Sequence, residues 1–147
     1  MSAGSVSVNL SKVKRFTDFA DGYLRPRLQE TLKARDELLA SASHYANLRD
    51  NVEVLRKSKL EKLKTKVDIG CDCLVQAVVP DPSRIFVNIG LGFSVEMLLD
   101  EVAPFCVEKE GLLRRRAERL IAKATEINTH LRLVTSGIAE LMQAGVD

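Results

Sequence analysis

The sequence contains no tryptophan, and aromatic residues make up only 5% of its 147 residues. This scarcity argues against a thick globular core. Apolar residues account for 46% of the chain and charged residues for 29%, a balance typical of long amphipathic helices. The length fits one domain or one elongated unit.

A strong charge of one sign is also missing, because the formal net charge is only +2. Two stretches are locally basic, Arg56 to Lys66 and Arg114 to Arg116, but acidic residues such as Glu61 and Glu118 lie among or beside them. Mixed charge of this kind is typical of a solvated helix face. We therefore expect no direct nucleic-acid partner.

Long apolar runs are absent as well. No segment approaches the roughly 20 apolar residues that span a bilayer, and Met1 to Val8 lack the basic start and apolar centre of a secretory signal. We expect no membrane partner and an intracellular chain, in which thiols stay reduced.

Cysteine is scarce, with three residues in the chain. Cys71 and Cys73 share one face of an expected strand, but they lack the second pair of Cys or His ligands that a closed zinc site requires. His44 and His130 lie far from them in the sequence. We expect these thiols and Cys106 to be buried apolar side chains, with no bound metal.

Catalytic motifs are missing too. Gly90-Leu91-Gly92 lacks the third glycine and the following helix of a dinucleotide loop, and the chain has no phosphate-binding P-loop. Neither histidine belongs to a known signature with a Ser or Cys nucleophile. We expect no enzymatic activity, no catalytic residues and no cofactor.

What the sequence does have is an alternating stretch from Val67 to Met97, in which nearly every odd-numbered residue is apolar and most even-numbered residues are polar or glycine. A period of two predicts strands with one face for burial and the other mostly for water. Turn residues divide the stretch into expected strands near residues 66–70, 72–79, 84–89 and 93–97.

Two turns predict two hairpins. Ile69 to Asp72 can close the first, and Gly90-Leu91-Gly92 can close the second, because glycine tolerates positive φ. Pro80 to Ser83 connects the hairpins with residues that favour turns. Isolated hairpins are marginal in water, so another surface has to cover the apolar face and meet the open edges.

A long helix is predicted before the strands, at about residues 11–65, with Asn9 or Ser11 as its cap. Its apolar residues recur every three or four positions. They are Phe16, Ala20, Tyr23, Leu24, Leu28, Leu32, Leu38, Ala42, Tyr45, Leu48, Val52 and Leu55.

Gly22 and Pro26 interrupt this helix. A proline inside a helix removes one hydrogen bond and commonly bends the axis, so we expect a kink or a helix start near Leu24 to Pro26. Nothing further along is expected to stop the helix before Lys64.

A second helix is predicted after the strands, at about residues 99–143. Its apolar residues step by four and three, the pattern of a coiled coil, and the N-terminal helix folded back antiparallel is the expected partner. Pro104 suggests a start later than this pattern implies. The apolar positions are Leu113, Ala117, Leu120, Ala124, Ile127, Leu131, Val134, Ile138 and Leu141.

The strand motifs resemble those of the α-type prefoldin subunits. The resemblance rests on Val67-Asp68-Ile69-Gly70, Val78-Val79-Pro80-Asp81 and Gly90-Leu91-Gly92-Phe93, and it covers most of the chain from about residue 12 onward. More narrowly, Val67 to Cys71 and Ala77 to Ile85 are similar to a prefoldin-like α subunit. The resemblance implies an α+β fold in one unit, residues 1–147, with two long antiparallel coiled-coil helices flanking two short β-hairpins.

The resemblance also implies a non-enzymatic chaperone or cochaperone subunit. Its partners would be other prefoldin or prefoldin-like subunits of α and β type in a hetero-oligomer, expected to be hexameric, together with unfolded or assembling client proteins. Assembly would use Val67, Ile69, Val75, Ile85, Val87, Ile89, Phe93 and Val95. Client binding would use the helix tips, Phe16, Phe19, Tyr23, Leu24, Val134, Ile138 and Leu141, for which plain coiled-coil packing is an equally simple interpretation.

Three alternatives remain open at this point. A nuclear adaptor that binds transcription factors through its coiled coil is also implied by the narrower resemblance, with cytoplasmic and nuclear localisation. A core prefoldin α subunit shares the features of the fold. A thiol enzyme or zinc protein built on Cys71 and Cys73 is the third.

Overall fold

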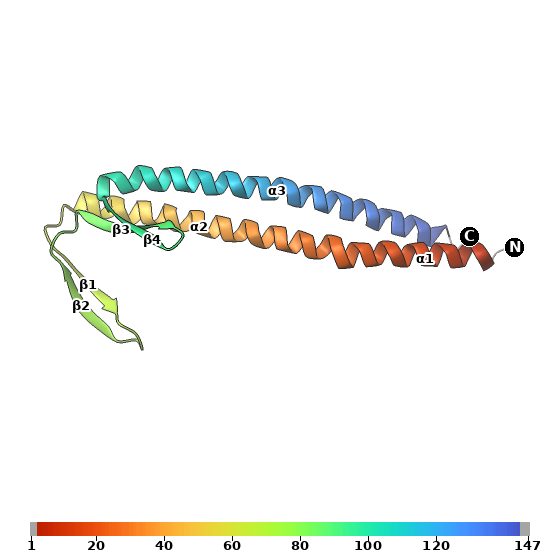
Figure 1. Cartoon of the computed structure of the whole chain (residues 1–147), viewed down its shortest axis with the longest axis horizontal. Coiled ribbons are helices and arrows are strands. Elements are labelled where there is room, and N and C mark those ends of the chain that lie inside the picture. The colour runs from red at the N-terminus through yellow and green to blue at the C-terminus, as the bar shows by residue number, and fades with distance from the viewer. Residues whose placement is uncertain (1–2, 145–147) are drawn as a thin grey trace. The chain divides into compact units, whose positions relative to one another are not determined.

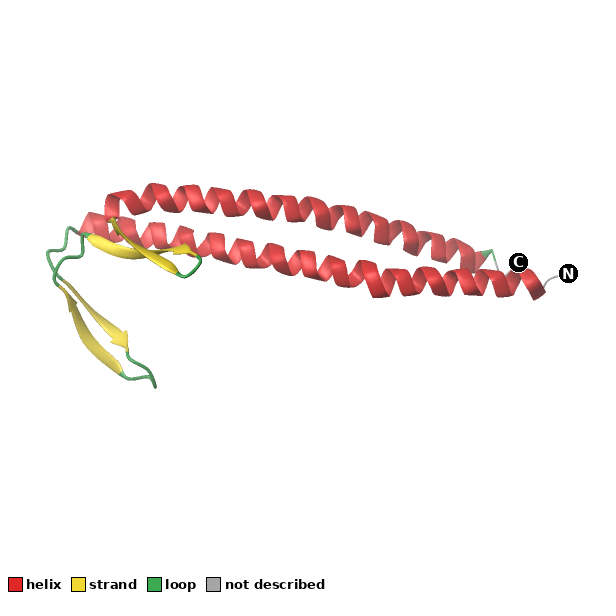
Figure 2. Ribbon diagram, viewed as in Figure 1, coloured by secondary structure: helices red, strands yellow, loops and turns green. Residues whose placement is uncertain are grey.

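A computed structural model describes residues 3–144, in which helices precede and follow four strands (Figures 1 and 2). The chain divides into two units. The helical unit comprises residues 1–40 and 114–147, and the hairpin unit comprises residues 41–113. None of the helices within the described residues is long and apolar enough to cross a membrane.

The helical unit contains α1 (Ala3–Phe19), the π-helical turn η1 (Ala20–Leu24), the start of α2 (Arg25–Ser58) and the end of α3 (Leu99–Gln143). Within this unit the N-terminal helices and α3 run antiparallel (Figure 1). The buried apolar residues of the unit lie on the predicted stripes of both helices, and they are Ala20, Leu24, Ala117, Ala124 and Ile127. The predicted antiparallel coiled coil is therefore confirmed for this unit.

The π-helical turn explains how the helix accommodates Pro26. The backbone N–H of Arg25 donates to the carbonyl of Ala20, five residues earlier. A wider turn of this kind often marks a disturbed stretch of α-helix, and proline supplies the disturbance because it has no N–H and clashes with the preceding turn. The interruption lies where the sequence predicted it, but the helix neither stops nor begins there.

The limits of the N-terminal helix differ from the prediction. The helix begins at Ala3, so the cap expected at Asn9 or Ser11 is wrong. Serine and asparagine carry only a modest penalty inside a helix, so their presence does not force a start. The helix ends at Ser58, well before Lys64, and the positive φ of 42° at Lys59 takes the chain out of the helical region.

The first hairpin pairs β1 (Leu63–Asp68) with β2 (Leu74–Val79) antiparallel. Leu63 pairs with Val79, and Val67 pairs with Val75. β1 therefore begins earlier than expected, because its alternation extends back to Leu63.

The second hairpin pairs β3 (Arg84–Gly90) with β4 (Phe93–Leu98), and a bulge lies between Asn88 and Gly90. Both hairpin turns use the same local bond. Gly70 N–H donates to Asp68 Oδ1 over 2.8 Å, and Gly90 N–H donates to Asn88 Oδ1 over 2.8 Å. Each glycine then takes a positive φ of 109°, which its lack of a side chain permits.

The core of the hairpin unit is formed by Val52 of α2, Val87 of β3, and Val102 and Cys106 of α3. Partly buried apolar residues pack around this cluster, and they are Tyr45, Leu48, Ile85, Met97, Leu99 and Phe105. One face of β3, together with Met97 of β4, is thus covered by the chain's own helices. No residue of β1 or β2 belongs to this cluster.

Two hydrogen bonds join the C-terminal end of β3 to the helices. Tyr45 Oη donates to the carbonyl of Asn88 over 3.1 Å, and Lys109 Nζ donates to the carbonyl of Ile89 over 3.4 Å. The rings of Tyr45 and Phe105 meet edge to face, 6.2 Å apart, a favoured aromatic geometry.

The start of α3 departs from the expectation based on Pro104. The helix begins at Leu99, where the backbone N–H of Leu98 donates to Glu101 Oε2 over 3.1 Å and that of Leu99 donates to the carbonyl of Ser83 over 3.1 Å. These bonds satisfy amides that a helix start leaves unpaired. They fix the start of α3 at Leu99, ahead of Pro104, so the prediction of a later start is wrong.

Candidate assembly and client-binding surfaces

The β1–β2 hairpin exposes the apolar face that its sequence prepares for burial. Val67, Ile69 and Val75 are 46%, 69% and 47% exposed. A pleated strand directs alternate side chains to one face, and the register pairs Val67 with Val75 on that face. The two-stranded sheet has two open edges, because neither strand pairs with any other strand within residues 3–144.

The structure places the predicted assembly residues in two groups. Val67, Ile69, Val75, Phe93 and Val95 are exposed.

The others, Ile85, Val87 and Ile89, lie on the face of β3 that meets the chain's own helices. Val87 is 2% exposed and belongs to the core, and Ile85 and Ile89 are half-buried. A substitution at Val87 would therefore disturb this unit's own packing.

Further exposed apolar residues were missed by the sequence interpretation. Phe86, on the other face of β3, and Leu91, in the turn, are 74% and 97% exposed. The available signal was that Phe86 breaks the polar pattern of the even-numbered positions. Next to Phe86 on the same face, Arg84 and Glu96 form an ion pair of 3.7 Å across the strands.

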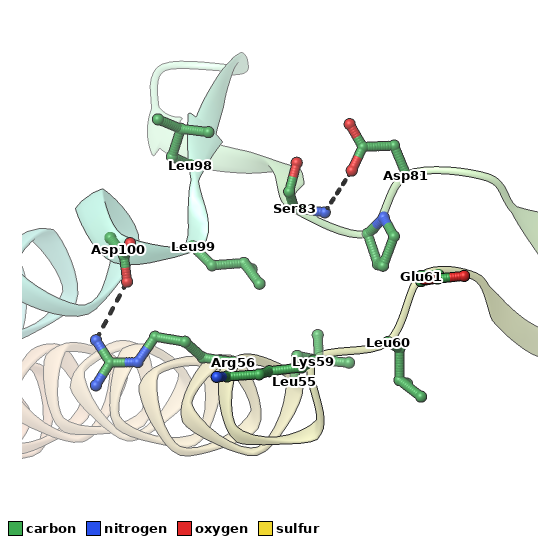
Figure 3. Close-up of a pocket in the computed structure, with 11 residues that line it drawn as sticks. Leu55, Arg56, Lys59, Leu60, Glu61, Asp81, Ser83, Leu98, Leu99 and Asp100 are labelled. Atoms are coloured by element: carbon green, nitrogen blue, oxygen red, sulfur yellow. Dashed lines mark hydrogen bonds and ion pairs between the residues drawn. The ribbon is translucent and has the colours of Figure 1, made fainter.

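A pocket of about 300 Å³ lies in the hairpin unit, where α2, the β2–β3 connection and the start of α3 meet (Figure 3). Arg56 and Asp100 form an ion pair of 3.3 Å at its wall. Asp81 Oδ1 accepts a bond of 3.0 Å from the backbone N–H of Ser83. Hydrogen bonds from the Ser83 side chain and backbone lower the pKa of Asp81. The Asp81–Ser83 bond orders the connection between the hairpins, and the Arg56–Asp100 pair joins α2 to the start of α3.

The cysteines correct one prediction and support another. Cys71 and Cys73 are exposed, so the expectation that they are buried is wrong. Cys71 and Asp72 take positive φ in the turn, so Cys71 lies outside both strands, and Cys73 directly precedes β2. Cys106 is buried in the core as expected, and burial raises the pKa of its thiol.

No group of three or more His, Cys, Asp or Glu residues that could hold a metal ion occurs among residues 3–144. His44 and His130 are both exposed on their helices.

The tip of the helical unit carries exposed aromatic residues. Phe16, Phe19 and Tyr23 are each about half exposed. The Phe19 and Tyr23 rings stack 5.5 Å apart, and the Arg27 side chain bonds the Tyr23 hydroxyl. Leu24, predicted with them, is instead buried in the seam between the helices.

Two apolar grooves flank Phe16 in the helical unit. One, of about 620 Å³, is lined by Phe16, Leu133, Val134, Gly137, Glu140, Leu141 and Ala144. The other, of about 580 Å³, is lined by Lys12, Arg15, Phe16, Phe19 and Leu141. The structure thus brings Phe16 together with Val134 and Leu141, and adds Leu133, which lies off the predicted stripe. Ile138 is half-buried and lines neither groove.

Comparison with known proteins identifies the family. The family model described as "Prefoldin subunit" matches residues 24–144. Protein UXT homolog of Nematostella vectensis is 36% identical over 132 residues, which cover 88% of this chain and 83% of that protein. Protein UXT of Homo sapiens is 34% identical over 137 residues, which cover 93% and 87%.

More distant similarities agree with this result. Prefoldin subunit alpha of Pyrococcus horikoshii is 30% identical over 84 residues, covering 52% of this chain and 57% of that protein. A chain in the cryo-EM structure of filamentous PFD from Methanocaldococcus jannaschii shares the fold, with a TM-score of 0.50 and 14% identity, covering 86% of this chain and 98% of that chain. The chain belongs to the prefoldin family, as a subunit similar to Protein UXT.

Proposed function

We propose that the chain is a non-catalytic subunit of a heteromeric prefoldin-like chaperone or cochaperone. It assembles with other prefoldin-type subunits through its hairpins and holds unfolded or assembling client proteins at the tip of its helical unit. Membership of the prefoldin family supports assembly with such subunits. The subunit classes, the hexameric stoichiometry and the client proteins belong to the proposal.

The observation that carries this proposal is the uncovered β1–β2 hairpin. Its apolar face is exposed at Val67, Ile69 and Val75, and both of its edges are open within the described residues. An isolated two-stranded hairpin is marginal in water, and unpaired strand edges readily accept another chain. A partner subunit supplies both the missing cover and the missing strands.

The experiment is native mass spectrometry of the chain co-expressed with α-type and β-type prefoldin subunits. The wild-type chain is expected in a mixed hexamer. Val75→Asn should reduce the fraction of the chain found in the hexamer, because it removes an apolar contact from the exposed face. The matched control Gln76→Asn, on the opposite face of the same strand, should leave that fraction unchanged. A wild-type chain that stays monomeric beside those subunits contradicts the proposal.

Substitutions at Ile85 and Val87 do not serve this test. Both residues pack against the chain's own core, so a charge there would unfold the hairpin unit and remove assembly indirectly.

The adaptor hypothesis and the expected cytoplasmic and nuclear localisation stay predictions. No feature of the described residues favours a transcription factor over any other partner.

A further inference from the structure

The open edge of β1 carries a column of positive charge. Lys64 and Lys66 alternate with Leu63, Thr65 and Val67 along the strand, so both lysines project to the face opposite the apolar one. Both are exposed, and no carboxylate lies within ion-pairing distance of either one in the part of the chain that the structure describes.

The backbone groups of these lysines point toward the open edge. In the first hairpin, Ile69 N–H donates to the carbonyl of Cys73 across the strands over 3.0 Å. Bonding directions alternate along an antiparallel strand, so odd-numbered residues of β1 bond toward β2 and even-numbered residues face away from it. A strand that joins the β1 edge would therefore bond with Lys64 and Lys66.

Such a strand would place its own side chains beside the lysines. The Cβ atoms of directly opposite residues on paired strands lie about 4.5–5.5 Å apart. Opposite charges at such positions stabilise the pair, and like charges destabilise it. We propose that the β1 edge selects a partner-subunit strand that carries Asp or Glu at the alternating positions facing Lys64 and Lys66. This inference rests on the proposed assembly function and adds a charge rule for the choice of partner.

The same geometry argues against a second copy of this chain as the occupant. Two β1 edges pairing with each other would bring lysines against lysines. The chain's other strands offer little negative charge to Lys64 and Lys66. On the corresponding face β2 carries Leu74, Gln76 and Val78, and Glu96 of β4 is already paired with Arg84.

A nucleic acid fits this surface less well. Proteins that bind single strands without sequence preference combine positive charge with aromatic residues on which bases stack. Residues 60–79 contain neither an aromatic residue nor an arginine. An extended acidic segment fits the lysines better, because its alternate side chains have the same spacing as Lys64 and Lys66 along β1.

The test uses the full chain co-expressed with α-type and β-type prefoldin subunits, in four forms. These are the wild type, Lys64→Glu/Lys66→Glu, Lys64→Arg/Lys66→Arg, and the matched control Lys33→Glu/Lys123→Glu, which makes the same change of charge at exposed sites of the helical unit. Hexamer fraction is measured by native mass spectrometry, and dissociation is followed at low and high salt. Circular dichroism and thermal unfolding verify that each variant is folded.

We expect the Glu pair to weaken the hexamer by about tenfold or more, because two favourable cross-strand pairs become repulsive. The Arg pair and the control should assemble like the wild type. Wild-type dissociation should accelerate with salt, which screens exposed charges, and a carbodiimide should cross-link Lys64 or Lys66 to a partner's Asp or Glu.

The outcomes separate the two proposals. A Glu pair that assembles as well as its control overturns the charge rule and leaves the assembly function standing. A wild-type chain that forms no heteromer overturns both. A wild-type complex that nuclease treatment dissolves overturns the charge rule in favour of a nucleic acid.

Discussion

Val52 and Val54 test the core of the hairpin unit with one amino acid in two environments. Both lie on α2, and they are 1% and 63% exposed. Val52→Ala should lower the free energy of unfolding by about 2 kcal/mol, through lost apolar burial and the cavity left behind. Val54→Ala should change it by less than about 0.5 kcal/mol. Urea denaturation of both variants measures the difference, and equal effects would contradict the assigned core.

The three thiols should react in two classes. Cys71 and Cys73 are exposed and Cys106 is buried, so a maleimide should label the first two quickly in the native protein and the third only after unfolding. Intact-protein mass spectrometry counts the labels, with the urea-unfolded chain as control. Rapid labelling of all three thiols in the native state would exclude the buried position of Cys106.

Burial also gives Cys106 a pH dependence of known sign. Because burial raises the pKa of this thiol, the folded state holds the proton more tightly than the unfolded chain does. The contribution to stability is complete below the unfolded pKa and is lost as the pH rises through the folded pKa.

These cysteines show what a pattern of single residues can and cannot predict. Cys106 was predicted correctly: it lies seven residues before Leu113, on the apolar pattern of the C-terminal helix, and a repeat sustained over many turns has one burial face. The alternation that placed Cys71 and Cys73 says which residues share a strand face, but not whether the strand continues into them or whether anything covers that face. Val67 and Val75 share such a face, and they remain 46% and 47% exposed.

Replacing Gly22 and Gly90 by alanine should have opposite effects on stability. A side chain at Gly22 would meet nothing within 4 Å, and its backbone is helical, so Gly22→Ala should stabilise the protein by about 0.5–1 kcal/mol. Gly90 also has open space, but its φ is +109°. Gly90→Ala should therefore destabilise the second hairpin by about 1–2 kcal/mol.

Thermal unfolding followed by circular dichroism compares the two variants with the wild type. A rise for Gly22→Ala with a fall for Gly90→Ala is the expected result. A fall at both positions would mean that the π-helical turn also needs glycine.

Helix and strand limits were the least predictable features, for local reasons. The helix ends at Ser58 because the chain turns at Lys59, yet lysine is a good helix former and gives no stop signal. Pro26 signalled an interruption correctly, but the sequence alone could not distinguish a π-helical turn from a break. At Leu99, the start of α3 depends on the carbonyl of Ser83, which only the folded connection brings near.

The two proposed activities depend on different units, so they are separable by mutation. The hairpin unit holds its own core of Val52, Val87, Val102 and Cys106 and leaves β1–β2 for partners. The helical unit buries the apolar residues between its helices, and Phe16 stays exposed beside two apolar grooves. A substitution at the tip should therefore change client binding without changing assembly.

Phe16→Ser provides this test, with Ile121→Ser as a control at an apolar residue of similar exposure on the same unit. In the purified heteromer, the wild type should suppress the aggregation of chemically denatured citrate synthase, measured by light scattering. Phe16→Ser should weaken the suppression several-fold, because it removes the aromatic side chain shared by both grooves and apolar contact area drives client binding. Ile121→Ser should act like the wild type, and native mass spectrometry should find both variants in the same heteromer. Equal suppression by both variants would assign Phe16 to coiled-coil packing alone and place the client-binding surface elsewhere.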